Sequence, residues 1–231
     1  MESSSMDDDE IVSGIRQSSG SSRRSFLQRS ATLGAGALAL AIGSSNTALA
    51  SEDSDSETSD VDVLNFALTL EHLEYAFYRD SLKRFDCADF RQAKSLNGFG
   101  NRVMEDVRPN FVDIRDHEKT HVDTLTDVIK DLGGEPVGEA CYDFQIEAVD
   151  DFIAVAAVLE NTGVSAYDGA IGKIENTDLV TAGATIATVE ARHASYLNVL
   201  NDDDPFPAAF DEPKAKEEVL EAAGGFIVEC E

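Results

Sequence analysis

Cysteine is scarce in this chain of 231 residues, and its 3 cysteines lie far apart. Cys87, Cys141 and Cys230 form no CxxC pair, so the sequence excludes a metal knuckle built from cysteine thiolates. Three cysteines allow three different single disulfides, or only free thiols. Cys87 and Cys141 both fall in predicted loops, where a disulfide would tie long connections together. These alternatives stay open at this point.

Basic side chains are scarce as well. The chain has 18 Lys and Arg residues against 45 Asp and Glu residues, which gives a formal charge of −27. Nucleic acid and anionic membranes are unfavourable partners for it, because they carry charge of the same sign. The acidic residues are spread over the predicted polar helix faces, as in proteins that live in high salt, where screening suppresses self-repulsion. An acidic protein from an ordinary environment is the alternative.

Strand patterns are nearly absent, so we expect an all-α fold. Apolar residues at steps of three and four predict four long helices instead. Their expected ranges are Val61 to about Phe85, about Glu105 to Leu132, about Glu147 to about Ile174, and from just after Asn176-Thr177-Asp178 to Leu200. Gly133-Gly134 is expected to end the second helix, and Thr177 or Asp178 to cap the fourth. Pro109 would lie in the first turn of the second helix or kink it.

Helices of this length predict a four-helix bundle made of two helical pairs. The long crossover is expected between helices two and three, where residues 135–145 must carry the chain along the bundle. A short helix is expected near Phe90–Leu96, between helices one and two. In this organisation residues 61–201 form the bundle, and residues 202–231 form a C-terminal tail packing on it.

Two of the predicted helices carry the motif Glu-x-x-His, as Glu118 with His121 and as Glu190 with His193. Residues three apart share one face of a helix, so the carboxylate and the imidazole of each pair can reach one metal ion. Each pair interrupts an apolar stripe and therefore faces the core. A bare carboxylate there is costly, and a divalent metal ion would supply the compensation.

The other two helices each place one lone carboxylate on the inner stripe, Glu71 and Glu160. Each follows a leucine and is followed, seven residues later, by a tyrosine, Tyr78 or Tyr167. The chain is thus an imperfect duplication. Four carboxylates balance two divalent ions, and two neutral imidazoles complete the set, which is the ligand inventory of di-iron and di-manganese carboxylate bundles. A bundle that keeps these carboxylates without binding metal is the alternative.

The first 50 residues predict a twin-arginine export signal. Arg23-Arg24 precedes an apolar run from Ala31 to Gly43, and Ala48-Leu49-Ala50 is a small-residue cleavage site. The run is too short for a permanent membrane span, although an uncleaved anchor is the alternative. Such signals serve proteins that fold before export, so we expect an extracellular or cell-surface protein that is loaded with metal inside. Residues 51–60 contain only Ser, Thr, Asp and Glu and are expected to be a disordered linker.

The chain resembles the ferritin-like domain family of exported stress- and desiccation-related proteins. The resemblance covers about Asp62 to Ile227. It is carried by LNFALTLEHLE at 64–74, EARHASYL at 190–197, and the tail segments PFPAAFD at 205–211 and EEVL at 217–220. It implies a ferritin-like four-helix bundle with a centre of two iron or manganese ions. Together with the acidic composition and the signal, it indicates a haloarchaeal source.

The resemblance also implies a role for each ligand. Glu118 and Glu190 would be the two carboxylates that bridge the ions. His121 and His193 would give one imidazole to each ion, and Glu71 and Glu160 would be the terminal carboxylates.

Five neighbouring residues are not part of this ligand set. Glu74 is a seventh ligand, a surface charge or the true ligand of helix one, and the matching frame of Glu160 and Tyr167 favours Glu71 over it. Tyr78 and Tyr167 would donate hydrogen bonds to ligands, with ordinary core tyrosines as the alternative. His72 and His117 lie off the inner stripe and are expected at the surface.

These features are compatible with three functions. The first is an oxidoreductase whose iron or manganese ions activate a small-molecule oxidant, oxygen or a peroxide. It would not be of the rubrerythrin type, because the CxxC pairs that deliver electrons there are missing. The second is metal binding or storage without turnover, for which the acidic exterior argues against a large cage but not against a homodimer. The third is a structural stress protein.

Overall fold

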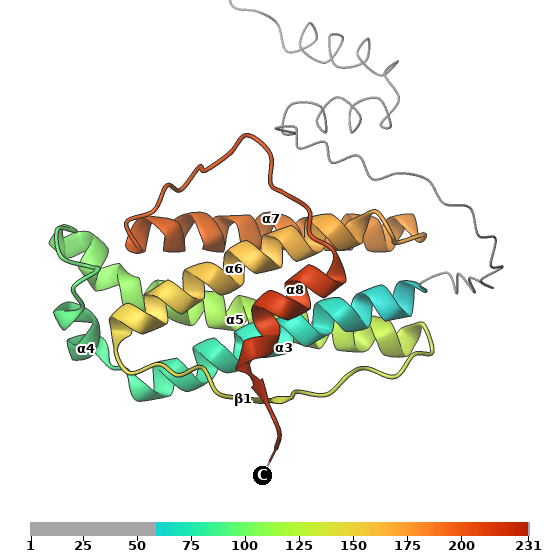
Figure 1. Cartoon of the computed structure of the whole chain (residues 1–231), viewed down its shortest axis with the longest axis horizontal. Coiled ribbons are helices and arrows are strands. Elements are labelled where there is room, and N and C mark those ends of the chain that lie inside the picture. The colour runs from blue at the N-terminus through green and yellow to red at the C-terminus, as the bar shows by residue number, and fades with distance from the viewer. Residues whose placement is uncertain (1–58, 231) are drawn as a thin grey trace, which may run out of the picture. The chain divides into compact units, whose positions relative to one another are not determined.

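Four long helices, α3, α5, α6 and α7, run along a common axis, and a short helix, α8, lies against α6 (Figure 1). The computed structural model describes residues 59–230, so the predicted signal sequence and nearly all of the predicted linker lie outside the described residues. The helices and strands are α3 (Asp60–Arg84), α4 (Cys87–Gln92), α5 (Asn101–Asp131), β1 (Cys141–Tyr142), α6 (Val149–Ile171), α7 (Thr177–Leu200), α8 (Lys216–Ala223), the 3-10 turn η1 (Gly224–Phe226) and β2 (Ile227–Val228). The predicted all-α fold is confirmed.

Local sequence signals set several helix ends. Ser59 caps α3 reciprocally with Asp62, since Oγ of Ser59 accepts from the Asp62 N–H and Oδ2 of Asp62 accepts from the Ser59 N–H. The end of α5 is the predicted double glycine. Gly133 has a φ of 79°, and the N–H groups of Gly133 and Gly134 donate to the carbonyls of Lys130 and Ile129. This is the left-handed helix ending that glycine favours.

Three local predictions are wrong in detail. The second long helix begins at Asn101 rather than near Glu105, so of the two places predicted for Pro109 the first turn of the helix is excluded. The cap of α7 is Asn176, whose side chain accepts from the Asp178 N–H, rather than Thr177 or Asp178. The short helix is α4, which begins at Cys87, because Asp86 caps it with bonds from the N–H groups at positions 88 and 89.

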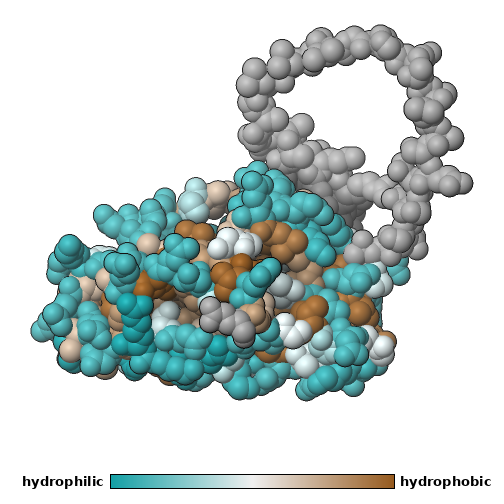
Figure 2. All heavy atoms as spheres, turned by 60° about the horizontal axis from the view of Figure 1, so that its bottom comes forward, coloured by the Kyte–Doolittle hydropathy of each residue, from teal (hydrophilic) through white to brown (hydrophobic). Residues whose placement is uncertain are grey.

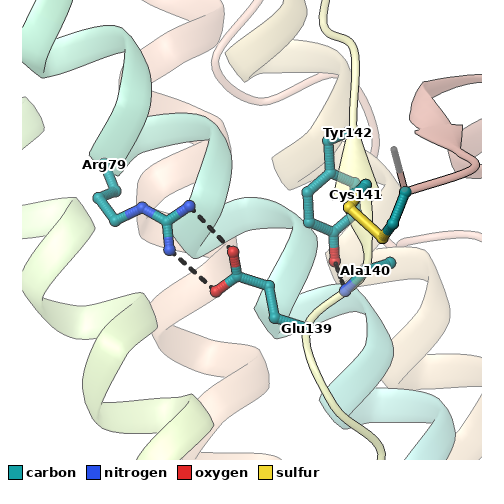
Figure 3. Close-up of a disulfide and its surroundings, with 6 residues drawn as sticks. Arg79, Glu139, Ala140, Cys141 and Tyr142 are labelled. Carbon is teal, nitrogen blue, oxygen red and sulfur yellow. Dashed lines mark hydrogen bonds and ion pairs between the residues drawn. A yellow bond between two sulfur atoms is a disulfide. The ribbon is translucent and has the colours of Figure 1, made fainter.

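The connection between α5 and α6 runs along the length of the bundle, as a long crossover (Figure 1). Three side chains at seven-residue intervals on α3 hold it. Asn65 pairs with the backbone of residues 135 and 137, His72 contacts the Val137 carbonyl, and Arg79 makes two bonds to the Glu139 carboxylate (Figure 3). Residues seven apart share one face of a helix, so one stripe of α3 is used to fix the crossover.

A disulfide joins the crossover to the end of the described chain. Cys141 is bonded to Cys230 (Figure 3). Cys87 is free and exposed. Next to this disulfide, β1 and β2 form a small antiparallel pair with Cys141 opposite Val228. The C-terminal segment is therefore fastened covalently to a connection 89 residues earlier in the sequence. Val219 and Ala223 of α8 are buried in the main apolar core.

Two apolar clusters fill the bundle on either side of its middle. The larger contains Phe152, which lies among the rings of Phe77, Tyr78, Phe85, Phe90 and Phe111. The smaller is built around Leu68, Ile129 and Tyr167. On the face shown in Figure 2, hydrophilic side chains form the margins and apolar ones gather near the centre. No helix among residues 59–230 is long and apolar enough to cross a membrane.

Candidate metal centre

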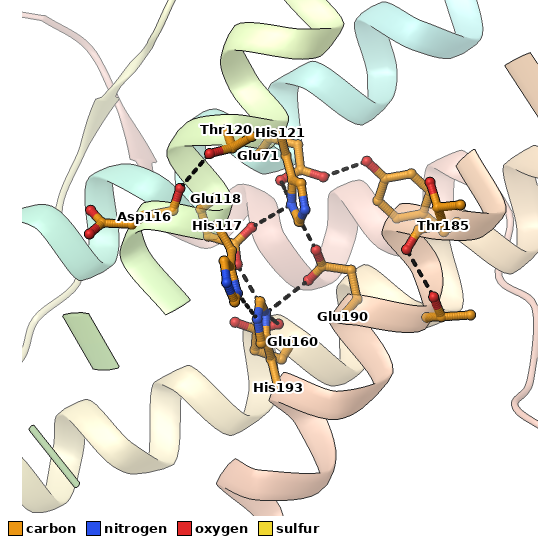
Figure 4. Close-up of polar contacts among 12 residues, drawn as sticks. Glu71, Asp116, His117, Glu118, Thr120, His121, Glu160, Thr185, Glu190 and His193 are labelled. Atoms are coloured by element: carbon orange, nitrogen blue, oxygen red, sulfur yellow. Dashed lines mark hydrogen bonds and ion pairs between the residues drawn. The ribbon is translucent and has the colours of Figure 1, made fainter. Parts of the chain in front are cut away.

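All four long helices bring acidic or imidazole side chains to the middle of the bundle, between the two apolar clusters (Figure 4). The contributors are Glu71 from α3, Glu118 and His121 from α5, Glu160 from α6, and Glu190 and His193 from α7. The four glutamates are 0% exposed, and the two histidines are at most 8% exposed. The structure thus brings together all six residues that the sequence pattern selects.

The six side chains divide into two groups, in each of which the ligand atoms lie within 4.8 Å of one another. The first group, called here the His121 subsite, contains Glu71, Glu118, His121 and Glu190. The second, the His193 subsite, contains Glu118, Glu160, Glu190 and His193. Glu118 and Glu190 belong to both, and each subsite adds one terminal glutamate and one imidazole.

The two shared carboxylates offer one oxygen to each subsite. Oε2 of Glu118 lies 3.1 Å from Nδ1 of His121, and its Oε1 lies 3.0 Å from Nδ1 of His193. Glu190 is placed in the same way, with Oε1 3.0 Å from Nδ1 of His121 and Oε2 3.7 Å from Nδ1 of His193. This is the placement that two bridging carboxylates require.

Many of these buried atoms lack hydrogen bonds. Oε1 of Glu118, Oε2 of Glu160, both carboxylate oxygens of Glu190 and Nδ1 of His193 have no hydrogen-bond partner among the described residues. Nδ1 of His193 approaches Oε1 of Glu118 closely, but without the alignment of a hydrogen bond. Buried polar atoms normally have partners. Unpaired atoms converging on common points are what metal ligands look like, so the residues present fit a di-metal centre.

The pKa values in the metal-free cluster reflect both burial and crowding. Burial raises the pKa of Glu71 to about 8, although contact with His121 offsets part of the effect. Burial lowers the pKa of His193, but the carboxylates around it outweigh burial and raise this pKa to about 12. Burial raises the pKa of Glu190, and the two imidazoles overcome that and lower it to about 2. Metal ions must therefore displace protons when they bind.

Two tyrosines hold the terminal glutamates crosswise. The hydroxyl of Tyr78 donates to Oε1 of Glu160 at 2.6 Å, and the hydroxyl of Tyr167 donates to Oε1 of Glu71. Each tyrosine lies seven residues after one terminal glutamate and binds the other one. Burial, and then the neighbouring carboxylate, raises both tyrosine pKa values well above the usual value, so both hydroxyls stay donors. The sequence indicates the pair, but the exchange of partners depends on how α3 and α6 pack.

Glu74 is not a surface charge, which corrects one of the three alternatives. Its side chain is buried but belongs to neither subsite. Burial, and then the nearby carboxylates of Glu190 and Glu160, raises the pKa of Glu74 well above the usual value. Its counterpart in the other half is Gly163, three residues after Glu160. A Cβ on Gly163 would lie 3.0 Å from Oε1 of Glu74, so the glycine leaves room for this acid.

The two other histidines do more than the sequence predicts. His72 is half-buried and holds the crossover through the Val137 carbonyl. His117 is exposed, as expected, but its Nδ1 lies 3.0 Å from Nε2 of His193 (Figure 4). His117 immediately precedes the ligand Glu118. Periodicity placed it off the inner stripe but gave no sign that its ring reaches across to α7.

Comparison with known proteins agrees with this architecture. Residues 59–202 match the model of the ferritin-like domain family. That segment includes all four long helices and all six candidate ligands, and it is more than half of the chain. The protein therefore belongs to the ferritin-like domain family. No curated protein matches the chain.

Proposed function

We propose that this protein is an exported oxidoreductase with a centre of two iron or two manganese ions, which acts on oxygen or a peroxide in oxidative or desiccation stress. The observation that carries the proposal is the number of donors. Each subsite supplies three carboxylates and one imidazole, whereas iron and manganese commonly take up to about six ligands. A small molecule therefore has room to bind at the centre. When bound, the metal ions would supply redox chemistry.

The protein's own residues would hold the ions and keep the centre dry. Glu118 and Glu190 would bind both ions, and their burial at 0% exposure excludes bulk water. Tyr78 and Tyr167 orient the terminal glutamates by their hydrogen bonds. Reduction of oxygen or a peroxide consumes protons, and Glu74, whose pKa burial and the nearby carboxylates raise above its usual value, would be placed to hold one near the centre.

The surroundings of the centre favour a small substrate. The large surface cavity of about 1060 Å³ lies between α6, α7 and the segment 203–214, and none of the six ligands lines it. Access to the centre thus suits oxygen or hydrogen peroxide better than a bulky organic molecule. Imidazole and carboxylate ligands suit iron and manganese alike.

Reconstitution without oxygen, followed by elemental analysis, tests the proposal. We expect about two iron or manganese ions per chain, and consumption of oxygen or hydrogen peroxide by the loaded protein. Glu190→Ala should lower the metal content to one ion or none, because this residue belongs to both subsites. The control is His72→Leu, which alters a contact with the crossover and should keep the full content. Wild-type protein without metal would contradict a di-metal centre, and loaded protein without turnover would favour metal storage.

A further inference from the structure

The two ligand histidines are held differently. Each directs Nδ1 toward the carboxylates, which leaves Nε2 as the outer nitrogen. Nε2 of His193 is 3.0 Å from Nδ1 of His117. Nε2 of His121 makes no hydrogen bond to another of the residues 59–230. One imidazole of the centre is therefore supported by a second imidazole, and the other is not.

The contact between His117 and His193 has the geometry of a strong hydrogen bond. The two ring planes are within 11° of each other, and the ring centroids are 5.2 Å apart. This separation exceeds the distance of 3.0 Å between the nitrogens by about two ring radii. The rings thus lie edge to edge and nearly in one plane, where the N–H of one imidazole points along the lone pair of the other.

Metal binding would decide which ring donates. A metal ion needs the lone pair of Nδ1 of His193, so the proton of this ring must be on Nε2. Nε2 then donates to Nδ1 of His117, whose own proton lies on its Nε2. A hydrogen bond from the outer nitrogen fixes the tautomer and orientation of a ligand histidine and raises its basicity.

We propose that His117 is a positioning residue that makes the two subsites unequal, so that the His193 subsite binds its ion more tightly and fills first. The inference rests on the di-metal centre proposed above and names no further ligand. His117 acts on the ion through His193 and does not touch the ion itself.

The internal duplication supports this asymmetry. Glu118 and His121 correspond to Glu190 and His193 at a constant offset of 72 positions, so the counterpart of His117 is Val189. Valine has no side-chain atom that accepts a hydrogen bond. At this position the second half of the chain therefore has no side chain that could support His121 in the same way. The two halves of the sequence thus differ at the position immediately before each shared glutamate, which is His117 in one half and Val189 in the other.

A titration of the metal-free full chain with Mn²⁺ alone tests the proposal, with free ion followed by its electron paramagnetic resonance signal. The wild type should bind two ions in two steps of different affinity. His117→Leu removes the acceptor and should weaken the tighter step by about 10- to 100-fold while leaving the other unchanged. His117→Asn keeps an acceptor close to the position of Nδ1 and should remain within a few-fold of the wild type. Because His117 is exposed, all three proteins should stay folded in chelator, with at most a small shift of the urea midpoint in His117→Leu from the loss of one hydrogen bond.

A second pair of variants identifies the subsite. In a His121→Ala background the remaining strong step belongs to the His193 subsite, and adding His117→Leu should weaken it by the same factor. In a His193→Ala background the added change should have no effect. Equal titrations of wild type and His117→Leu, equal weakening of both steps, or a His117→Asn variant as weak as His117→Leu would each overturn the proposal. A wild type that binds no Mn²⁺ would instead contradict the proposed function.

Discussion

At the residue scale, the crosswise hydrogen bonds of Tyr78 and Tyr167 give an unusual expectation. Tyr78→Phe leaves Glu160 without its hydrogen-bond donor and should lower the metal affinity of the His193 subsite. Tyr167→Phe leaves Glu71 without its donor and should lower the metal affinity of the His121 subsite. The loss of such a support typically costs about 10- to 100-fold in metal affinity. Competition with a chelator measures both affinities.

Tyr196→Phe is the matched control for the tyrosine variants. Its hydroxyl accepts from Asn110 and contacts no ligand, so both affinities should stay as in the wild type. If Tyr78→Phe weakened only the His121 subsite, the crosswise arrangement would be wrong.

The pH dependence of stability follows from the shifted pKa values. In the metal-free protein the pKa of Glu71 is about 8, against an unfolded value of 4.5, so the native state binds more protons between these values. The same holds for His193 between 6.5 and about 12. The stabilisation that these two groups contribute is therefore present at low pH, and it is lost as the pH rises through each of these two intervals. Glu190, whose pKa is lowered to about 2, contributes stability that is lost as the pH falls, but only at pH values below 4.5.

We therefore expect metal-free protein to lose stability between about pH 5 and about pH 8, while the stabilisation by Mn²⁺ grows, because fewer protons compete for the ligands. Urea unfolding in chelator and in excess Mn²⁺ measures both trends. Glu71→Gln should flatten the metal-free curve in this interval. Parallel curves with and without metal would show that the protons and the ions do not compete for the same groups.

At the scale of the elements, the parts that could be predicted are those with a local or periodic signal. The apolar stripes predict the four long helices. The acidic and imidazole residues that interrupt these stripes, such as Glu71 and the Glu-x-x-His pairs, predict the buried cluster of candidate metal ligands. Contacts that depend on packing have no such signal. The bond between Cys141 and Cys230 spans 89 residues, and nothing near either cysteine indicates the partner. His117 was missed because periodicity reports the face of a helix and not the reach of a side chain at its edge.

The crossover is an element without helical hydrogen bonds of its own, so its position depends on α3 and on the disulfide. Replacing both Cys141 and Cys230 by Ser should lower the free energy of unfolding by about 2–4 kcal/mol, because the unfolded chain gains the entropy of an open loop. Urea denaturation measures this change. Cys87→Ser is the control, since Cys87 is free and exposed. The metal content should be retained, because no ligand lies on the crossover, and a loss of metal would show that the crossover supports the centre.

At the scale of the whole molecule, the chain is a duplication whose two halves have diverged at particular places around the centre. Glu71 and Glu160, and the two Glu-x-x-His pairs, keep the symmetry. Glu74 opposite Gly163 breaks it, as does His117 opposite Val189. A symmetric centre would bind two ions alike, whereas these differences place one buried acid near the centre and one second imidazole behind His193. Under the proposed function, this asymmetry would favour one orientation of a small molecule at the centre.

Export is the remaining prediction for the whole molecule, and its signal lies outside the described residues. A route that carries folded proteins suits a buried centre, because the chain can fold around its ions before it is exported. Replacing Arg23 and Arg24 together by Lys should leave precursor inside the cell, and wild-type protein should be recovered outside with a mature end near Ser51. Immunoblots of cell and medium fractions, with sequencing of the mature end, measure this. Arg29→Lys, outside the twin pair, is the control and should be exported normally.

Exported wild-type protein should already contain its ions when it is collected in the presence of a chelator. Normal export of the Arg23 and Arg24 double variant would rule out the twin-arginine route, and with it the argument that the centre is filled inside the cell.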